Sequence, residues 1–310
     1  MVIFSHAQLP SAKNHQLLGS RLFGSHLFGS RLIRSVSLAL LAGVLPILLA
    51  ERASSQTAAT LRICASENEA PYSAREGKGF ENRIAVVLAE TMGRRPEIVW
   101  TSKPAIYLVR DYLDQNKCDV VMGLDTGDER VLTSKPYYRT GYAFVTLAER
   151  NVMASAWNDD QIHGLSRFAI RFYSPPAESI LRQLDKYEDN VAYLHSLVNF
   201  KSRRNQYVQV PAERLVSEVA SGEADIAIAF APEVARYVKA SSKPLRMTLI
   251  ASEITRSDGV KIPVQFDQSV GVRKGDTQLL AEIDAALVKA RPQIQQLLRA
   301  EGIPLLETHM

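Results

Sequence analysis

The sequence predicts an α/β protein built of two lobes with a cleft between them. Short apolar runs alternate with amphipathic segments between residues 61 and 145, and a similar alternation starts near residue 150 and ends near 262. From residue 268 the chain forms one more apolar run and a long amphipathic segment, which we expect to return to the first unit. The chain then crosses twice between the lobes, as in a hinged cleft.

The domain boundaries follow from these units. Residues 1–59 form a leader, residues 60–146 and 265–310 form lobe 1, and residues 147–264 form lobe 2. A chain of 310 residues is long enough for two lobes of ordinary size.

Lobe 1 contains a repeated strand–helix pattern that predicts a parallel sheet. One helix begins at Gly79 and ends at Gly93, with apolar residues at helical spacing between them. A buried strand ends at Gly123 and opens into a polar loop, the place where open α/β sheets bind ligands; a surface turn between two core strands is the alternative. The other expected elements are strands at 61–65, 97–100 and 140–146 and a helix at 105–116.

Lobe 2 and the tail contain further elements of the same kinds. One helix is expected to begin near Pro175, with proline in its first turn. The last helix, 277–298, contains Pro292, which is expected to break or kink it. The remaining predictions are strands or extended runs at 168–172, 208–210, 224–230, 245–250 and 268–273 and helices at 213–220 and 232–240.

The leader is typical of a secretory signal. The apolar block 35–50 has the length of a signal core, is short for a membrane span and contains Pro46. Cleavage is expected within 50–60, which would leave no membrane span; an uncleaved anchor is the alternative.

The whole chain has 37 basic and 33 acidic side chains, but five basic residues and one acidic residue belong to the leader. The remainder is neutral overall and does not indicate nucleic-acid binding.

The two cysteines, Cys64 and Cys118, stand at predicted strand ends of the same lobe. An even count in an exported chain permits one disulfide, and two buried thiols are the alternative.

The histidines are scattered and no Gly-x-Ser-x-Gly segment surrounds a serine, so no catalytic set is evident. Carboxylates near the expected cleft could bind calcium, but their spacing is not that of an EF-hand and solvated acids are favoured. We therefore predict no metal site.

The sequence resembles the extracellular solute-binding proteins of family 3, the amino-acid type, over about 61–305. The order of the units carries this resemblance together with the segments 123–137, 221–228 and 270–280. Lobe 1 is more closely similar to the members of that family that are associated with methanol oxidation, through the segments 61–73, 79–82, 109–114, 118–128 and 135–139. The resemblance implies a type II periplasmic binding-protein fold with two hinge crossings.

The resemblance also implies a function. Members of this branch are non-catalytic periplasmic accessory proteins, with the PQQ-dependent methanol dehydrogenase as the partner and assembly or maturation as the role. No cofactor is expected in the chain itself. A transporter receptor for a small solute other than an amino acid is the alternative, and an enzyme on the same fold, such as a periplasmic dehydratase, is a third hypothesis that lacks a clear acid–base pair.

Three departures argue against binding of free amino acids. The family holds the ligand carboxylate with a threonine and an arginine, but the matching segment from Thr126 to Arg130 is one residue longer, and pairing of Arg130 with an acid of its own loop is favoured. At the start of the helix that normally supplies N–H groups, Ser174 is followed by two prolines, which have none. Phe230 stands where the family places an aspartate for the ligand's amino group.

The candidate cleft residues come from the expected strand ends and from these matches. They are Asn68, Glu69, Tyr72, Glu81, Asp125, Thr126, Arg130, Ser174 and Phe230.

Overall fold

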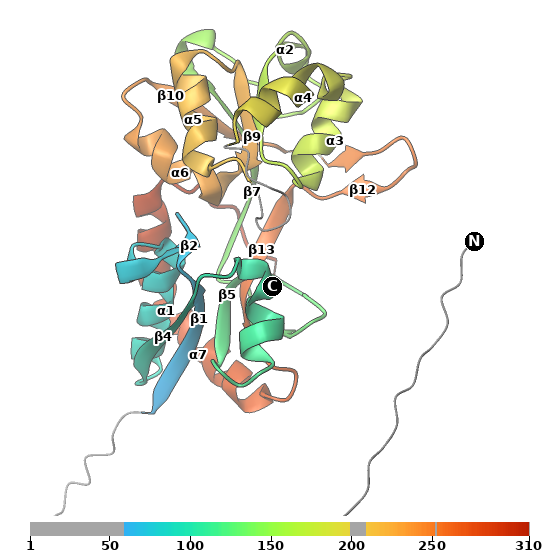
Figure 1. Cartoon of the computed structure of the whole chain (residues 1–310). Coiled ribbons are helices and arrows are strands. Elements are labelled where there is room, and N and C mark those ends of the chain that lie inside the picture. The colour runs from blue at the N-terminus through green and yellow to red at the C-terminus, as the bar shows by residue number, and fades with distance from the viewer. Residues whose placement is uncertain (1–58, 199–208, 252, 310) are drawn as a thin grey trace, which may run out of the picture. The chain divides into compact units, whose positions relative to one another are not determined.

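The structure, a computed structural model, describes residues 59–198, 209–251 and 253–309 (Figure 1). The predicted leader lies outside the described residues except for Ala59. None of the described helices is long and apolar enough to cross a membrane.

The first hydrophobic core surrounds a four-stranded region of the sheet in the order β4 (Arg95–Thr101), β1 (Thr60–Ser66), β5 (Val120–Asp125) and β13 (Gln265–Val272). Strand β1 is parallel to both of its neighbours, whereas β13 is antiparallel to β5 and also pairs with β6 (Leu132–Thr133). The parallel pairing of β1 with β4 and β5 confirms the parallel sheet predicted from the strand–helix repeat of lobe 1. Strand β13 is antiparallel because its residues arrive from lobe 2 rather than through a helical crossover.

Alternation along β1 directs its side chains to two layers. Leu61 and Ile63 pack with helices α1 (Phe80–Thr91) and α7 (Thr277–Glu301) on one face. Cys64 packs on the other face against Val109 and Leu113 of a short irregular helical segment.

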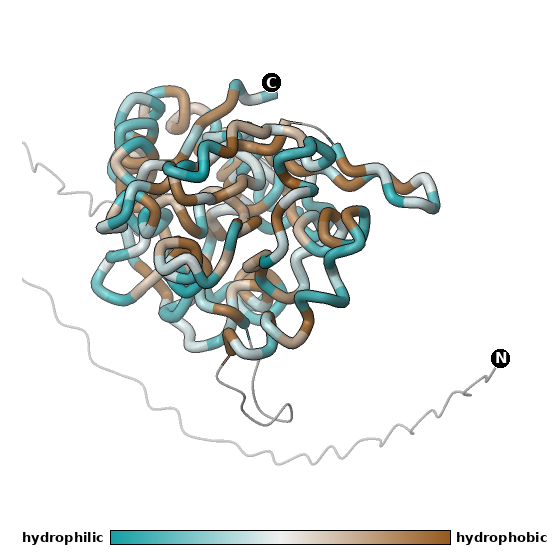
Figure 2. Tube along the Cα trace, turned by 90° about the horizontal axis from the view of Figure 1, so that it is seen from above, coloured by the Kyte–Doolittle hydropathy of each residue, from teal (hydrophilic) through white to brown (hydrophobic). Residues whose placement is uncertain are grey.

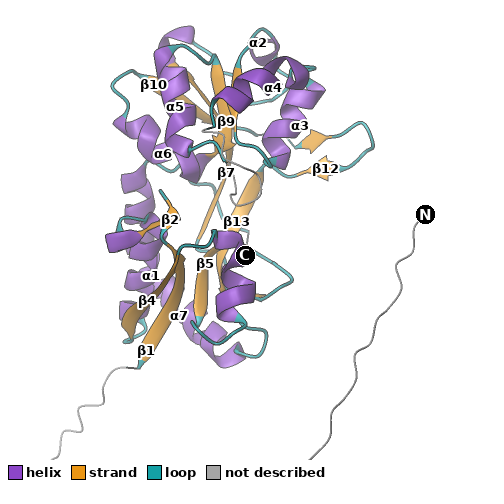
Figure 3. Cartoon of the chain, viewed as in Figure 1, coloured by secondary structure: helices purple, strands orange, loops and turns teal. Residues whose placement is uncertain are grey.

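The second core surrounds β7 (Tyr138–Leu147), β8 (Phe168–Ile170), β9 (Ile226–Phe230) and β10 (Leu245–Leu249). Strand β9 is parallel to β8 and antiparallel to β7, which also pairs with β10. Helices flank these strands in Figure 3: α2 (Asp160–His163), α3 (Pro175–Gln183), α4 (Tyr187–Ser196), α5 (Ala212–Ser221) and α6 (Ala231–Ala240). A hairpin of β11 (Ile254–Thr255) and β12 (Lys261–Ile262) extends away from this core (Figure 2).

Strands β7 and β13 run between the two cores (Figure 1). The start of β7 pairs with β13 through residues 138–141, and its remaining residues pair with β9 and β10. The end of the chain packs beside this junction, where Thr140 Oγ1 donates to the carbonyl of Pro304 at 2.6 Å. The fold therefore has two lobes joined by two crossings; the boundaries at residues 146 and 265 stay a prediction.

Several elements differ from their predictions. Strand β5 continues through Gly123 to Asp125, because an extra residue in β5 opposite Ser269–Gly271 forms a bulge that the positive φ of Gly123 accommodates. The predicted helix 105–116 is a 3-10 turn (η2, Ala105–Tyr107) followed by a π-helical turn (η3, Val109–Leu113).

Two regions of lobe 2 and the tail differ in part from the predictions: a break at Pro292 is contradicted, whereas a kink there and an extended run at 208–210 stay predictions. Helix α7 continues through Pro292, which is exposed on the same surface as Val288, so water can reach the carbonyl that lacks its N–H donor. Gln209 and Val210 form no strand, and Val208 lies outside the described residues. Short elements that were not predicted are β2 (Asn68–Glu69), β3 (Ser73–Ala74), η1 (Arg75–Gly77), η4 (Ala148–Arg150), β6, α2, β11 and β12.

A charged contact joins α6 to lobe 1. Glu301, 8% exposed, accepts from Arg83 on α1 and from Arg236 Nε on α6 at 2.7 Å. Arg236 also donates to the carbonyl of Lys78 at 3.0 Å. A buried carboxylate with two arginine partners thus connects α1, α6 and α7.

We predict that Glu301→Gln lowers the free energy of unfolding by about 1–2 kcal/mol, because it leaves two arginines without their anion and both are partly solvated. Glu282→Gln is the matched control. It removes a single ion pair, with Arg94, that is more exposed to solvent, and it should lower the free energy of unfolding by about 0.5 kcal/mol or less. Urea denaturation of both variants measures the difference. Equal losses would show that the buried contact adds nothing beyond a surface ion pair.

Candidate functional site

A cavity of about 340 Å³ lies at the end of β5, beside the start of α1. The β2–β3 segment, β9 and β13 contribute to its walls, so residues of both lobes line it. It brings together six of the predicted residues: Glu69, Tyr72, Glu81, Asp125, Arg130 and Phe230.

A second cavity, of about 410 Å³, shares four lining residues with the first: Ser66, Glu69, Ala105 and Ile106. It contains the predicted residues Asn68 and Ser174. Thr126 lines neither cavity, because its hydroxyl bonds with Ser269 Oγ at 2.7 Å and with the carbonyl of Asp267 at 3.1 Å. This threonine connects β5 to β13 instead of facing the space between the lobes.

Glu81 is positioned by the first turn of α1. Its backbone N–H donates to the carbonyl of Tyr72 at 3.0 Å. Its carboxyl group packs directly on Gly123, where an added Cβ would lie 2.0 Å from Glu81 Oε1. Only glycine leaves room for this carboxyl group, and its φ of +68° also favours glycine.

The environment of Glu81 favours its neutral form. Burial raises the pKa of this carboxyl to about 8, with a smaller contribution from the charge of Glu69. The carboxyl oxygens form no hydrogen bond or ion pair with any other described residue. Glu81 is therefore a mostly protonated acid at neutral pH that lines a cavity without a protein partner.

Asp125 ends β5 and accepts from Gln268 Nε2 at 2.6 Å. Burial raises the pKa of Asp125, and the hydrogen bond from Gln268 opposes this shift. Gln268 lines the same cavity, and the sequence analysis missed it because it lies 143 residues away on β13.

Arg130 is held by an acid of its own loop. Its Nε donates to Asp128 Oδ1 at 3.0 Å and a terminal nitrogen donates to Oδ2 at 2.6 Å. This is the pairing that the sequence favoured over contact with a ligand. The bidentate pair occupies one edge of the guanidinium group, and its carboxylate opposes the approach of an anion.

On the lobe 2 side, Arg171 donates to Glu233 Oε1 at 2.8 Å. Burial raises the pKa of Glu233, although Arg171 acts in the opposite direction. Ser174 donates its hydroxyl proton to Tyr142 Oη at 3.1 Å, so it is not a free donor. The sequence analysis missed Arg171, Glu233 and Tyr142, because no local motif marks them.

Phe230 closes the apolar side of the first cavity. Its ring lies 5.6 Å from that of Tyr142 and 5.9 Å from that of Phe266. These aromatic contacts surround Phe230 with apolar rings, so a ligand ammonium group beside this ring finds no counter-charge in it.

The described residues include no group of three or more His, Cys, Asp or Glu that could hold a metal ion. The carboxylates of the two cavities therefore do not converge on a single point. What the arrangement offers is a pair of cavities with apolar walls and separate acidic groups.

We predict that no proteinogenic α-amino acid binds with micromolar affinity. The carboxylate of such a ligand would meet Arg130 already paired with Asp128, and the helix start at Pro175 and Pro176 lacks two of its N–H donors. Titration calorimetry with each amino acid checks this prediction. A saturating isotherm for any of them would contradict it.

Comparison with known proteins places these features in a family. The sequence profile of the bacterial extracellular solute-binding proteins, family 3, matches residues 61–299. The chain is 52% identical over 257 residues to Protein MoxJ of Methylorubrum extorquens, covering 83% of this chain and 85% of that protein. It is 52% identical over 265 residues to Protein MoxJ of Paracoccus denitrificans, covering 86% and 95%.

Among solved structures, the chain is similar to MxaJ from Methlophaga aminisulfidivorans. The sequence identity is 50% and the TM-score 0.75, covering 80% of this chain and 100% of that one. These relatives have the two-lobed type II binding-protein fold, in agreement with the arrangement of β7 and β13 described above.

Proposed function

Because the chain belongs to the bacterial extracellular solute-binding proteins, family 3, we propose that it is a non-catalytic periplasmic accessory protein of a methanol oxidation system. In this role its two-lobed fold acts on the PQQ-dependent methanol dehydrogenase, in assembly or maturation. The observation that carries the proposal is the 52% identity to two MoxJ proteins over more than four-fifths of the chain.

The cleft supports a role other than amino-acid uptake. Arg130 is paired with Asp128, Ser174 with Tyr142, and Phe230 with neighbouring aromatic rings. The groups that would hold an amino acid are thus occupied or replaced, while the binding-protein scaffold remains. A scaffold changed in this way fits a protein whose partner is another protein.

Deletion of the gene in the bacterium that encodes it tests the proposal. We expect slow growth on methanol, normal growth on a substrate that bypasses methanol oxidation, and reduced dehydrogenase activity in the periplasm. Complementation with the tagged chain should restore growth and co-purify the dehydrogenase. Normal methanol growth with fully assembled dehydrogenase in the deletion strain would sink the proposal.

The two open cavities favour one second candidate, a receptor that delivers a small solute other than an amino acid to a transporter. The same deletion strain separates the two functions. A receptor role predicts loss of uptake of that solute and unchanged dehydrogenase activity in a cell extract.

A further inference from the structure

The charges lining the two cavities are predominantly negative. Four carboxyl groups face them, against two arginines. Arg130 is neutralised by Asp128 and Arg171 by Glu233, at 2.6 and 2.8 Å. The carboxyl groups without an arginine partner are Glu69, Glu81 and Asp125. An anionic ligand would be repelled, whereas a cation would gain a counter-charge.

Glu81 gives this acidic lining a defined binding group, which becomes a counter-charge when it releases its proton to form an ion pair. Its side chain is partly buried and forms no hydrogen bond or ion pair with another described residue, yet it lines the first cavity. A buried polar group without a partner is costly, and a ligand donor would remove that cost. Asp125 faces the same cavity from β5, with its Oδ1 bound by Gln268.

The walls around these acids suit an organic stem rather than a metal ion. The described carboxylates do not converge to hold a metal. Apolar side chains surround the acidic groups, together with the ring of Tyr72 from lobe 1: Ile106, Leu108, Val121, Met122, Leu124 and Phe230. The ring of Phe230 could also face a cation, a contact worth about 0.5–2 kcal/mol.

We propose that the first cavity binds the ammonium group of an organic amine that has an apolar stem and no carboxylate, with Glu81 and Asp125 as its counter-charges. This chemistry is shared by a free alkylamine and by the lysine side chain of a partner polypeptide. The proposal goes beyond the accessory function and does not depend on the identity of the partner protein.

Titration calorimetry of the purified protein at pH 7 tests the proposal with four matched probes. n-Butylamine represents a free amine, and Nα-acetyl-lysine amide represents a lysine side chain without a free carboxylate. n-Butanol removes the charge and butyrate reverses it. We expect one or both amines to bind at least tenfold more tightly than n-butanol, and butyrate to give no heat of binding.

Two variants connect binding to the cavity. Glu81→Gln and Asp125→Asn, each similar in shape to the original side chain, should weaken amine binding at least tenfold. Glu97→Gln changes an exposed carboxylate on β4 outside both cavities and should leave binding unchanged. In the unmodified protein, the measured enthalpy should depend on the ionisation enthalpy of the buffer, because Glu81 releases a proton when it pairs with the amine.

The calorimetric results distinguish a free amine from a lysine side chain as the ligand, and they show whether the proposal holds. Tighter binding of the blocked lysine assigns the site to a partner polypeptide, and tighter binding of butylamine assigns it to a free amine. Absence of a heat of binding for both amines at millimolar concentration overturns the proposal. So does binding of butyrate as strong as that of butylamine. These results would leave the accessory function untouched, since that function is tested by growth and dehydrogenase assembly.

Discussion

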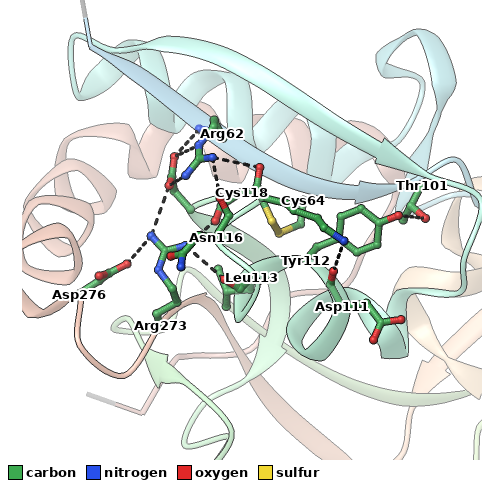
Figure 4. The surroundings of a disulfide bond; sticks show 12 residues. Arg62, Cys64, Thr101, Asp111, Tyr112, Leu113, Asn116, Cys118, Arg273 and Asp276 are labelled. Carbon is green, nitrogen blue, oxygen red and sulfur yellow. Dashed lines mark hydrogen bonds and ion pairs between the residues drawn. A yellow bond between two sulfur atoms is a disulfide. The ribbon is translucent and has the colours of Figure 1, made fainter. Parts of the chain in front are cut away.

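Replacing Cys64 and Cys118 together with alanine is expected to lower the free energy of unfolding by about 4 kcal/mol. The structure joins the two residues in a disulfide with their Cα atoms 5.5 Å apart (Figure 4). The bond closes a loop across 54 residues, and without it the unfolded chain regains the entropy of that loop. Both side chains are buried, at 3% and 0% exposure, so the alanines also leave small cavities.

The double variant should nevertheless fold. Asp119, next to Cys118, accepts from the guanidinium group of Arg62 at 2.6 Å and from Arg273 at 3.4 Å. Arg273 also donates to the carbonyl of Cys118 at 2.5 Å. These bonds hold the start of β5 beside β1 and β13 when the sulfur atoms are removed.

Urea denaturation with and without reductant measures this effect. Reductant should move the urea midpoint of unfolding of the unmodified protein toward that of the double variant, and it should leave the midpoint of the variant unchanged. Mass spectrometry after alkylation without reductant should show an unchanged mass for the unmodified protein. If the midpoints of the two proteins coincide under oxidising conditions, the disulfide makes no contribution to stability.

Elements with strong apolar periodicity could be predicted from the sequence. Helix α1 shows this clearly, since Ile84 and Leu88 on its buried face lie one turn apart. Helix α4 could not be predicted in this way, because Asn190 and Leu194 are its only buried residues. Asn190 is buried by its bonds to the backbone of Ser166, Lys186 and Phe168, a tertiary arrangement that leaves no apolar pattern.

The same distinction holds for the site. The ends of β1 and β5 and the start of α1 could be located from the chain order, which is why Glu69, Glu81 and Asp125 were found. Gln268 and Arg171 enter the cleft from strands and loops remote in sequence, so only the folded chain brings them there. Thr126 lines neither cavity, because its hydroxyl bonds with Ser269 on β13, a contact between residues far apart in the sequence.

We expect the stability of the protein to fall as the pH rises from about 4.5 to about 8, through the titration of Glu81. Burial raises the pKa of Glu81 from its ordinary 4.5 to about 8 in the folded state. Between these values the folded protein holds a proton that the unfolded chain has lost, so raising the pH favours unfolding. Below both values, each state is protonated and the full stability is present.

The charge of Glu69 acts in the same direction as burial. The buried phenols of Tyr137 and Tyr138 stay neutral over this range, because burial and then Glu81 raise their pKa values. None of them is a cation that could stabilise the ionised carboxyl group. The loss over the whole range should approach about 4 kcal/mol, at up to 1.4 kcal/mol per pH unit.

Glu81→Gln should remove this dependence, because the amide keeps the shape of the protonated acid and cannot ionise. Urea denaturation at pH 5, 6, 7 and 8 measures this. The free energy of unfolding of the variant, relative to that of the unmodified protein, should rise at each step and should be the larger of the two at pH 8. Glu97→Gln, on the exposed side of β4, should follow the unmodified protein throughout. Parallel curves for Glu81→Gln and the unmodified protein would mean that this carboxyl group is ionised in the folded state at pH 5 and that the cavity already supplies a partner for its charge.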